Sequence, residues 1–164
     1  QADGLFMGVC FGGQTLTELR SALSTAEADL RGGLSPRVTP MAEIRELGSL
    51  LQRAGLALPV ADSLKILAAY SDIYHLMRDL RDMGETNIMT ARPKTFTPKS
   101  LFDRAQEIFA IEFPADDSRI ACTFDLVFLS GWAPHASQPK ALKPGSVTKS
   151  LQQALEEAKS SLGN

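Results

Sequence analysis

Three apolar segments of the chain have the pattern expected of β-strands. Residues 5–11 are almost continuously apolar and stop at Gly12-Gly13, which is typical of a strand buried on both faces. Residues 60–70 contain a second candidate, centred on residues 64–69. From residue 119 to residue 130 apolar side chains recur at every second position, which is the clearest strand signal in the sequence.

Between these segments apolar residues recur every three or four positions, as they do on one face of an amphipathic helix. Thr15 and Glu18 have the spacing of a capping box, so the first helix is expected to begin there. Thr39 and Pro40 suit the cap and first turn of the second helix, and Gly84 suits the end of the third. The predicted helices cover residues 15–31, 39–54, 72–83 and 97–113.

The order of the predicted elements is strand, helix, helix, strand, helix, helix, strand, followed by a polar tail. This mixture indicates an α/β fold. Residues 85–97 follow no period and are predicted to form a surface loop, of a length that often borders a binding site. We expect one domain at residues 1–135 and a polar tail at residues 136–164, with a short helix near residues 149–162.

Composition and charge exclude several classes of partner. Of the 164 residues, 44% are hydrophobic and 22% charged, which is typical of a folded globular protein. A net charge of -2 offers no general attraction for nucleic acid or anionic lipid, so neither is expected as a partner. The longest apolar run, near residues 5–11, is far shorter than the roughly 20 residues that cross a bilayer, so no membrane span is expected.

The cysteines and the first residues bear on the cellular setting. Cys10 and Cys122 lie in apolar strand-like segments, where buried free thiols are common, and two Cys with two His show no metal-binding spacing. We therefore expect no metal site and a reduced, cytoplasmic setting. Residues 1–3 lead into the first strand without a basic segment or a cleavage site, so a secretory signal is not expected.

Five short blocks of the sequence occur in an order that points to a known family. They are DGLF at residues 3–6, FGGxTLxELR at 11–20, LGxLLxRAG at 47–55, LMRDLRxMG at 76–84 and GWAPH at 131–135. Together they resemble one branch of the class I S-adenosylmethionine-dependent methyltransferases, and several blocks in the right order are a stronger signal than any single block. This branch contains the biotin-synthesis carrier-protein methyltransferase and the mitochondrial complex I assembly factor, which keeps the fold and is described as a protein-arginine hydroxylase.

The resemblance implies the C-terminal half of a Rossmann-like class I methyltransferase sheet, with its fifth to seventh strands and flanking helices. In that family the last strand is antiparallel and lies between the fifth and the sixth. The glycine-rich turn and the acidic strand end that hold S-adenosylmethionine would precede residue 1, so no cofactor-binding residue is expected in this chain. Gly12-Gly13 follows a strand but lacks the G-x-G-x-x-G spacing of a dinucleotide-binding turn.

The function implied by the resemblance concerns a larger parent protein. The chain would be a fragment of a methyltransferase that acts on a carrier-linked or protein substrate, contributing substrate-side walls and inactive alone. The alternative is an assembly factor or protein hydroxylase of the respiratory complex I type, without methyl transfer. A third possibility is a complete small interaction module.

Eight residues are candidates for substrate binding, and each has a purely structural alternative. Glu18 and Arg20 follow the first strand, near the strand ends where this family places its substrate. Arg78 and Arg81 share one helix, where they would contact an acidic partner or only form surface ion pairs. The remaining candidates are Asn87 and Arg92 on the long loop, and Trp132 and His135 after the last strand.

The first strand also suggests an association. If the preceding strand of the family's sheet is absent, residues 5–11 present unpaired amides and apolar side chains on a sheet edge. We therefore expect the chain to self-associate through this strand.

Overall fold

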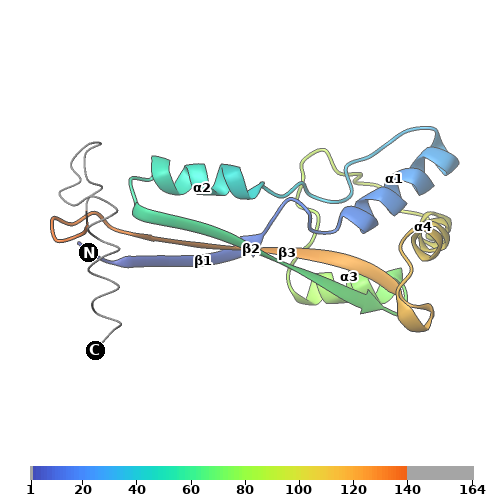
Figure 1. The fold of residues 1–164 in the computed structure, drawn as a ribbon. Coiled ribbons are helices and arrows are strands. Elements are labelled where there is room, and N and C mark those ends of the chain that lie inside the picture. The colour runs from blue at the N-terminus through green and yellow to red at the C-terminus, as the bar shows by residue number, and fades with distance from the viewer. Residues whose placement is uncertain (1, 140–164) are drawn as a thin grey trace, which may run out of the picture. The chain divides into compact units, whose positions relative to one another are not determined.

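A computed structural model describes residues 2–139 and shows a three-stranded sheet flanked by four helices (Figure 1). The strands are β1 (Leu5–Phe11), β2 (Ala57–Tyr70) and β3 (Ile120–Trp132), in the order β1-β3-β2. The central strand β3 runs antiparallel to both neighbours. This α/β arrangement is compatible with a methyltransferase-like fold, and all three predicted strands are present.

The four helices also match the predicted ones, with different starts. They are α1 (Thr17–Arg31), α2 (Ile44–Arg53), α3 (Ile73–Asp82) and α4 (Lys99–Glu112), and a short 3-10 helix, η1 (Asp116–Ser118), precedes β3. Either Ser71 or Asp72 suits the cap of α3 in the sequence, and the structure has Asp72 there, because its side chain accepts a hydrogen bond from the His75 amide at 2.8 Å. The chain divides into two compact units, residues 1–134 and 135–164, and the sheet and helices all belong to the first.

The predicted capping box at the start of α1 is wrong. The Thr15 hydroxyl instead donates to the Asp125 carbonyl at 3.2 Å and accepts from the Asp125 amide at 3.0 Å. The Glu18 carboxylate accepts hydrogen bonds from the amide and the hydroxyl of Thr123. Both side chains therefore tie the start of α1 to β3, and Leu16 precedes the helix in a left-handed conformation with φ of 59°.

The predicted start of α2 at Thr39 is also wrong. The helix begins at Ile44, where the Glu43 side chain and the Glu46 side chain cap each other's backbone amides. Glutamate is an unusual residue at the cap, so the preference for Thr39 and Pro40 misplaced the start. β2 is longer than predicted and includes Pro59, which an edge strand tolerates where the register shifts between Ala57 and Val60.

One end of the sheet is covered by α1, α3 and α4, and the hydrophobic core lies there. Helices α1 and α4 pack against each other, and α1 also contacts β3. The rings of Phe11 on β1 and Phe124 on β3 lie 5.9 Å apart beneath them. The largest core side chains with no more than 5% exposure are Leu16, Leu19, Leu23, Ile73, Leu76, Leu101, Ile108, Phe109 and Ile120.

The other end of the sheet leaves apolar side chains exposed, so the prediction that β1 is buried on both faces is wrong. Met7 is 73% exposed and Val9 60%, and Phe128, which lies opposite Val9 on β3, is 45% exposed. α2 packs against β2 at this end, where Gly48 approaches Ala61. β1 pairs only with β3 among the described residues and is therefore an edge strand.

Candidate functional site

The main concave region of the described residues lies where β1 ends. Three adjoining cavities of about 70, 320 and 410 Å³ share lining residues, and Glu85 lines all of them. We call this region the strand-end cleft. Its walls come from the end of β1, from the segment between α1 and α2, and from the segment between α3 and α4. Ligands of open α/β sheets bind beyond the carboxyl ends of parallel strands, and β1 and β2 are parallel to each other, each running opposite to β3.

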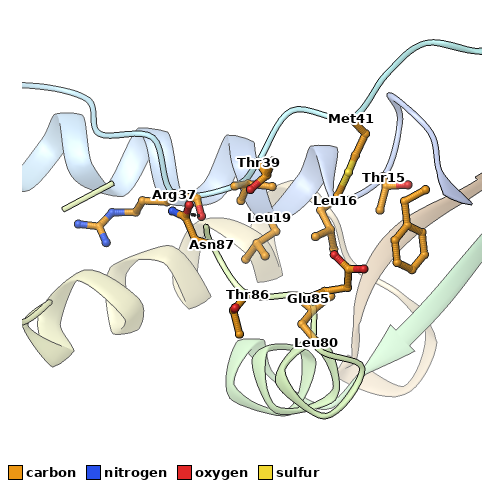
Figure 2. Close-up of a pocket in the computed structure, with 12 residues that line it drawn as sticks. Thr15, Leu16, Leu19, Arg37, Thr39, Met41, Leu80, Glu85, Thr86 and Asn87 are labelled. Carbon is orange, nitrogen blue, oxygen red and sulfur yellow. Dashed lines mark hydrogen bonds between the residues drawn. The ribbon is translucent and has the colours of Figure 1, made fainter. Parts of the chain in front are cut away.

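Figure 2 shows the smallest cavity of the cleft, which has a mainly apolar floor. Leu16 and Leu19 of the α1 region face Leu80 of α3 across it, and the Glu85 side chain extends between them. The Leu80 side chain belongs to the hydrophobic core. The floor of the cleft is therefore part of the helix-covered end of the sheet.

A buried ion pair holds one wall of the cleft in place. The Arg37 guanidinium donates to Glu27 Oε1 from Nη2 at 2.7 Å and from Nε at 3.1 Å. The Glu27 side chain is 1% exposed and also accepts a hydrogen bond from the Ser35 amide at 2.7 Å. Burial raises the pKa of Glu27, but the hydrogen bonds from Arg37 and Ser35 outweigh it and leave this pKa below its ordinary value.

The same ion pair connects the two walls of the cleft. Arg37 Nη1 donates to the Thr97 hydroxyl at 3.1 Å, across to the segment that precedes α4. The side-chain amide nitrogen of Asn87 donates to the backbone carbonyls of Pro36 and Arg37 at 2.8 and 3.0 Å. We call Glu27, Arg37, Asn87 and Thr97 the loop clamp, since together they fix one loop against the other.

The end of α3 fixes the position of Glu85. Gly84 has φ of 83°, a left-handed conformation that favours glycine, and its amide donates to the Arg81 carbonyl at 3.0 Å. The Glu85 amide donates to the Leu80 carbonyl at 2.8 Å. These two bonds form a Schellman motif, which turns the chain at the helix end and directs Glu85 into the cleft.

Three of the eight candidate residues line the strand-end cleft. Arg81, Asn87 and Arg92 all line the cavity of about 320 Å³. Asn87 uses its amide in the loop clamp, and Arg92 donates to the Met89 carbonyl at 3.0 Å. Arg81 is exposed on α3, with its side chain at the cavity wall.

The other five candidates lie outside the lining of the cleft. The Glu18 carboxylate accepts a hydrogen bond from the Thr123 amide. Arg20 is half-buried, and its Nη2 atom is buried without a hydrogen-bond partner in the described part of the chain. Arg78 is exposed on α3. Trp132 lies opposite Leu5, six positions along β3 from the cleft residue Leu126, a distance of about 20 Å.

His135 belongs to the second unit of the chain, and its contacts are local. Its Nδ1 atom lies 2.8 Å from the Ser137 hydroxyl, and its amide donates to the Gln138 side chain at 3.2 Å. The tail beyond residue 139, with the helix predicted near residues 149–162, lies outside the described residues.

Sequence reasoning missed Glu27, Arg37, Thr97 and Glu85. Glu27 carried a usable signal, because it lies beside Ala26 on the apolar stripe of α1, where a carboxylate must find a partner. Nothing in the sequence identified Arg37 as that partner, since the pairing depends on the path of the loop. Glu85 follows the predicted stop at Gly84, but the direction of its side chain required the structure.

The turn at Gly12-Gly13 does not fit a phosphate or carboxylate ligand. A Cβ atom at Gly12 would lie 2.6 Å from Asp125 Oδ2, and one at Gly13 would lie 2.1 Å from Glu43 Oε1. Protein carboxylates thus approach both glycines closely, and they would repel the carboxylate of S-adenosylmethionine at this turn.

Neither a metal site nor a catalytic triad is formed by the side chains of residues 2–139. No group of three or more His, Cys, Asp or Glu side chains there is placed to hold a metal ion. Ser71, His75 and Asp72 lie together, but both oxygens contact the same ring atom, His75 Nδ1, at 2.8 and 2.9 Å. This arrangement caps α3 and does not have the nucleophile, base and orienting group on opposite ring nitrogens.

No helix in the described part of the chain combines the length and apolar character needed to cross a bilayer.

Burial raises the pKa of Cys122 to about 12, so this thiol is structural and not a nucleophile.

Comparison with known proteins confirms the predicted resemblance. The chain is 39% identical over 148 residues to the mitochondrial arginine-hydroxylase NDUFAF5 of Dictyostelium discoideum, covering 90% of this chain and 34% of that protein. It is 35% identical over 149 residues to human NDUFAF5, covering 91% and 43%. It is 32% identical over 131 residues to the malonyl-[acyl-carrier protein] O-methyltransferase of Nitrosospira multiformis, covering 80% and 40%.

These relatives are longer than the chain, and they correct the predicted cellular setting. No family model matches the chain. The chain spans between a third and a half of the length of the curated relatives it matches. The predicted cytoplasmic setting is wrong, because the relatives with the higher identities are named as mitochondrial proteins. Free cysteines in strands indicate a reducing environment and do not distinguish one such compartment from another.

Proposed function

We propose that this chain is the substrate-side part of a methyltransferase-fold enzyme that modifies a protein or a carrier-linked group. The observation that carries the proposal is the strand-end cleft, whose two walls are fixed by the loop clamp at the carboxyl end of β1. A cleft held by an ion pair and several hydrogen bonds is pre-organised, which is what positioning a substrate requires.

The order of the strands supports a more detailed placement in the fold. In this proposal β1, β2 and β3 are the fifth, sixth and seventh strands of a class I methyltransferase sheet, and residues 1–135 form its C-terminal half. Support comes from the last strand, which lies antiparallel between the other two. The similarity to both groups of relatives over 80–91% of the chain points the same way.

S-adenosylmethionine would be bound by the remaining part of the complete protein. When bound, it supplies an activated methyl group, so that the protein contributes mainly alignment. Arg81, Asn87 and Arg92 are proposed as the substrate-side residues of this chain, because all three line the cleft. The chain alone is then expected to be inactive.

Arginine hydroxylation is a second candidate, favoured by a specific observation. Identity to the NDUFAF5 proteins is 35–39%, compared with 28–32% for the malonyl-[acyl-carrier protein] methyltransferases. The experiment compares proteins from cells with and without the complete gene by mass spectrometry. A gene-dependent gain of one methylene unit supports methyl transfer, and a gain of one oxygen atom supports hydroxylation. If no protein or carrier-linked group changes, the proposal of a modifying enzyme is refuted.

The free edge of β1 is part of the same proposal. β1 carries no charged side chain, whereas the other edge strand, β2, carries Asp62, Lys65 and Pro59, which discourage edge pairing. We propose that polypeptide of the complete protein pairs with β1, and that a second copy of this chain takes that place when the remaining part is absent.

A further inference from the structure

Three large apolar side chains lie mostly in water on the two segments that form walls of the cleft. They are Leu34, which is 72% exposed, in the segment between α1 and α2, and Ile88 and Phe96, which are 77% and 92% exposed, in the segment between α3 and α4. A single exposed apolar side chain is common on protein surfaces. Three of them point to a function only where the fold brings them onto one surface.

The loop clamp brings these three side chains together. Ile88 directly follows Asn87, and Phe96 directly precedes Thr97. Both of these clamp residues bond to the opposite loop at positions 36 and 37, a few residues after Leu34. The three apolar side chains therefore surround one set of hydrogen bonds. We call Leu34, Ile88 and Phe96 the apolar rim.

The two stretches of sequence that carry the apolar rim are basic. Residues 30–42 and 86–102 contain five Lys or Arg residues and no Asp or Glu, although the whole chain has a net charge of -2. Three of these cations approach a carboxylate of the chain. The other two, Arg92 and Lys94, are exposed and form no ion pair with the described residues. Glu85, which lies in the cleft just before the second stretch, offsets only part of this charge.

We infer that the apolar rim, together with Arg92 and Lys94, docks an acidic amphipathic segment of a partner protein. The apolar side chains of that segment cover Leu34, Ile88 and Phe96, and its carboxylates pair with the two free cations. Aromatic residues and arginine are enriched in protein interfaces, whereas a free surface rarely gathers them with exposed aliphatic side chains. The inference goes beyond the proposed function, because docking here requires no reaction in the cleft.

The charge of this surface suits a protein segment better than a membrane or a nucleic acid. Anionic membranes are bound by clusters of about four to eight basic residues. Nucleic acids likewise require several contacts from Lys or Arg to phosphates. Two free cations are too few for either partner, but two ion pairs beside three apolar contacts suit a short acidic peptide.

The test titrates three fluorescent peptides into the complete protein. The first is an amphipathic helix of glutamate and leucine, the second has every glutamate replaced by glutamine, and the third has every leucine replaced by serine. The first peptide should bind about threefold to tenfold more tightly than the second, because two exposed ion pairs are lost, and still more tightly than the third. Equal binding of the first peptide and either of the others would overturn the inference.

Two matched pairs of variants assign the binding to this surface. Ile88→Ser should weaken binding of the first peptide about tenfold, whereas Ile111→Ser on α4 should leave it unchanged, although both isoleucines are 77% exposed. Lys94→Gln should weaken it about twofold to fivefold, and Lys65→Gln, at an exposed lysine of β2, should not. Equal losses within each pair would refute the site. Thermal unfolding should be unchanged in all four variants, because each replaced side chain already lies in water.

Vesicles of phosphatidylcholine and phosphatidylglycerol in equal parts test the membrane as the alternative partner. Ile88→Ser should leave the sedimentation of the complete protein with these vesicles unchanged, while it weakens peptide binding. Vesicle binding that Ile88→Ser abolishes would show that the apolar rim inserts into lipid, and it would refute docking of a protein segment there.

Discussion

The two ends of β3 differ sharply in what covers them. Phe124 and Phe128 are the same residue type, lie four positions apart and therefore point to the same face of the sheet. Phe124 is 8% exposed and contacts Phe11 beneath the helices, whereas Phe128 is 45% exposed beside Val9. The same alternating pattern thus runs from the hydrophobic core at Phe124 to a half-exposed surface at Phe128, which no helix of residues 2–139 buries.

This difference shows what a periodic pattern can and cannot reveal. Alternation reports that a strand has two faces, but the partner that buries each face comes from elsewhere in the fold. An apolar sheet surface that remains exposed is a common mark of an interaction site. We therefore propose that the helix-covered end is the chain's own core and that the exposed end is a surface for more polypeptide.

The largest expected effect separates the two phenylalanines. Phe124→Ala should lower the free energy of unfolding by about 3–5 kcal/mol, because it removes a buried ring and leaves a cavity. Phe128→Ala should cost less than about 1 kcal/mol in the isolated chain, because the ring is already half in water. Urea denaturation of both variants measures the difference, and similar losses would contradict the division into two ends.

The next effect concerns the loop clamp, which belongs to the covered end. Arg37→Met should cost about 3 kcal/mol, since it leaves the buried Glu27 carboxylate without its cation. Arg31→Met is the matched control, because Arg31 also approaches Glu27 Oε1, at 3.8 Å, but is 38% exposed. That variant should cost less than about 1 kcal/mol, measured in the same way. Equal costs would mean that the loop clamp does not stabilise the cleft.

The loop clamp also predicts a pH dependence. Because the pKa of Glu27 is lower in the folded chain than its ordinary value of 4.5, the unfolded chain binds the proton more tightly. The stability contributed by Glu27 is therefore complete above that ordinary value and is lost as the pH falls toward the folded pKa. The free energy of unfolding should change less with pH across this range in Glu27→Gln than in the wild type. It is measured by urea denaturation at several pH values. The same dependence on pH in both proteins would contradict the assignment.

Much of the covered end could be predicted from the sequence, because its signals are local. The stripe of α3, its cap at Asp72 and its stop at Gly84 all lie within one short segment. The start of α1 failed for the opposite reason, since Thr15 and Glu18 bond to residues of β3 more than one hundred positions away. The candidate site divides in the same way. Arg81 and Arg92 were predicted from their places on a helix and a loop, whereas the pairing of Arg37 with Glu27 depends on the path of the loop.

A smaller effect should follow from the turn that positions Glu85. Gly84→Ala should cost about 1 kcal/mol, because alanine is strained at φ of 83°. Gly33→Ala is a suitable control, since a Cβ there meets nothing within 4 Å and the residue has no positive φ. Thermal unfolding should separate these variants, and equal unfolding temperatures would contradict the role of the turn.

Association at the exposed end gives the most direct test of the division into two ends. Light scattering of the isolated chain across micromolar concentrations should show a mass that rises above that of the monomer. Met7→Lys, which adds a charge to β1, should restore the monomer, whereas Leu67→Lys on β2, at a similarly exposed position, should not. A wild-type chain that stays strictly monomeric throughout would contradict the claim that the β1 end of the sheet is built to be covered by more polypeptide.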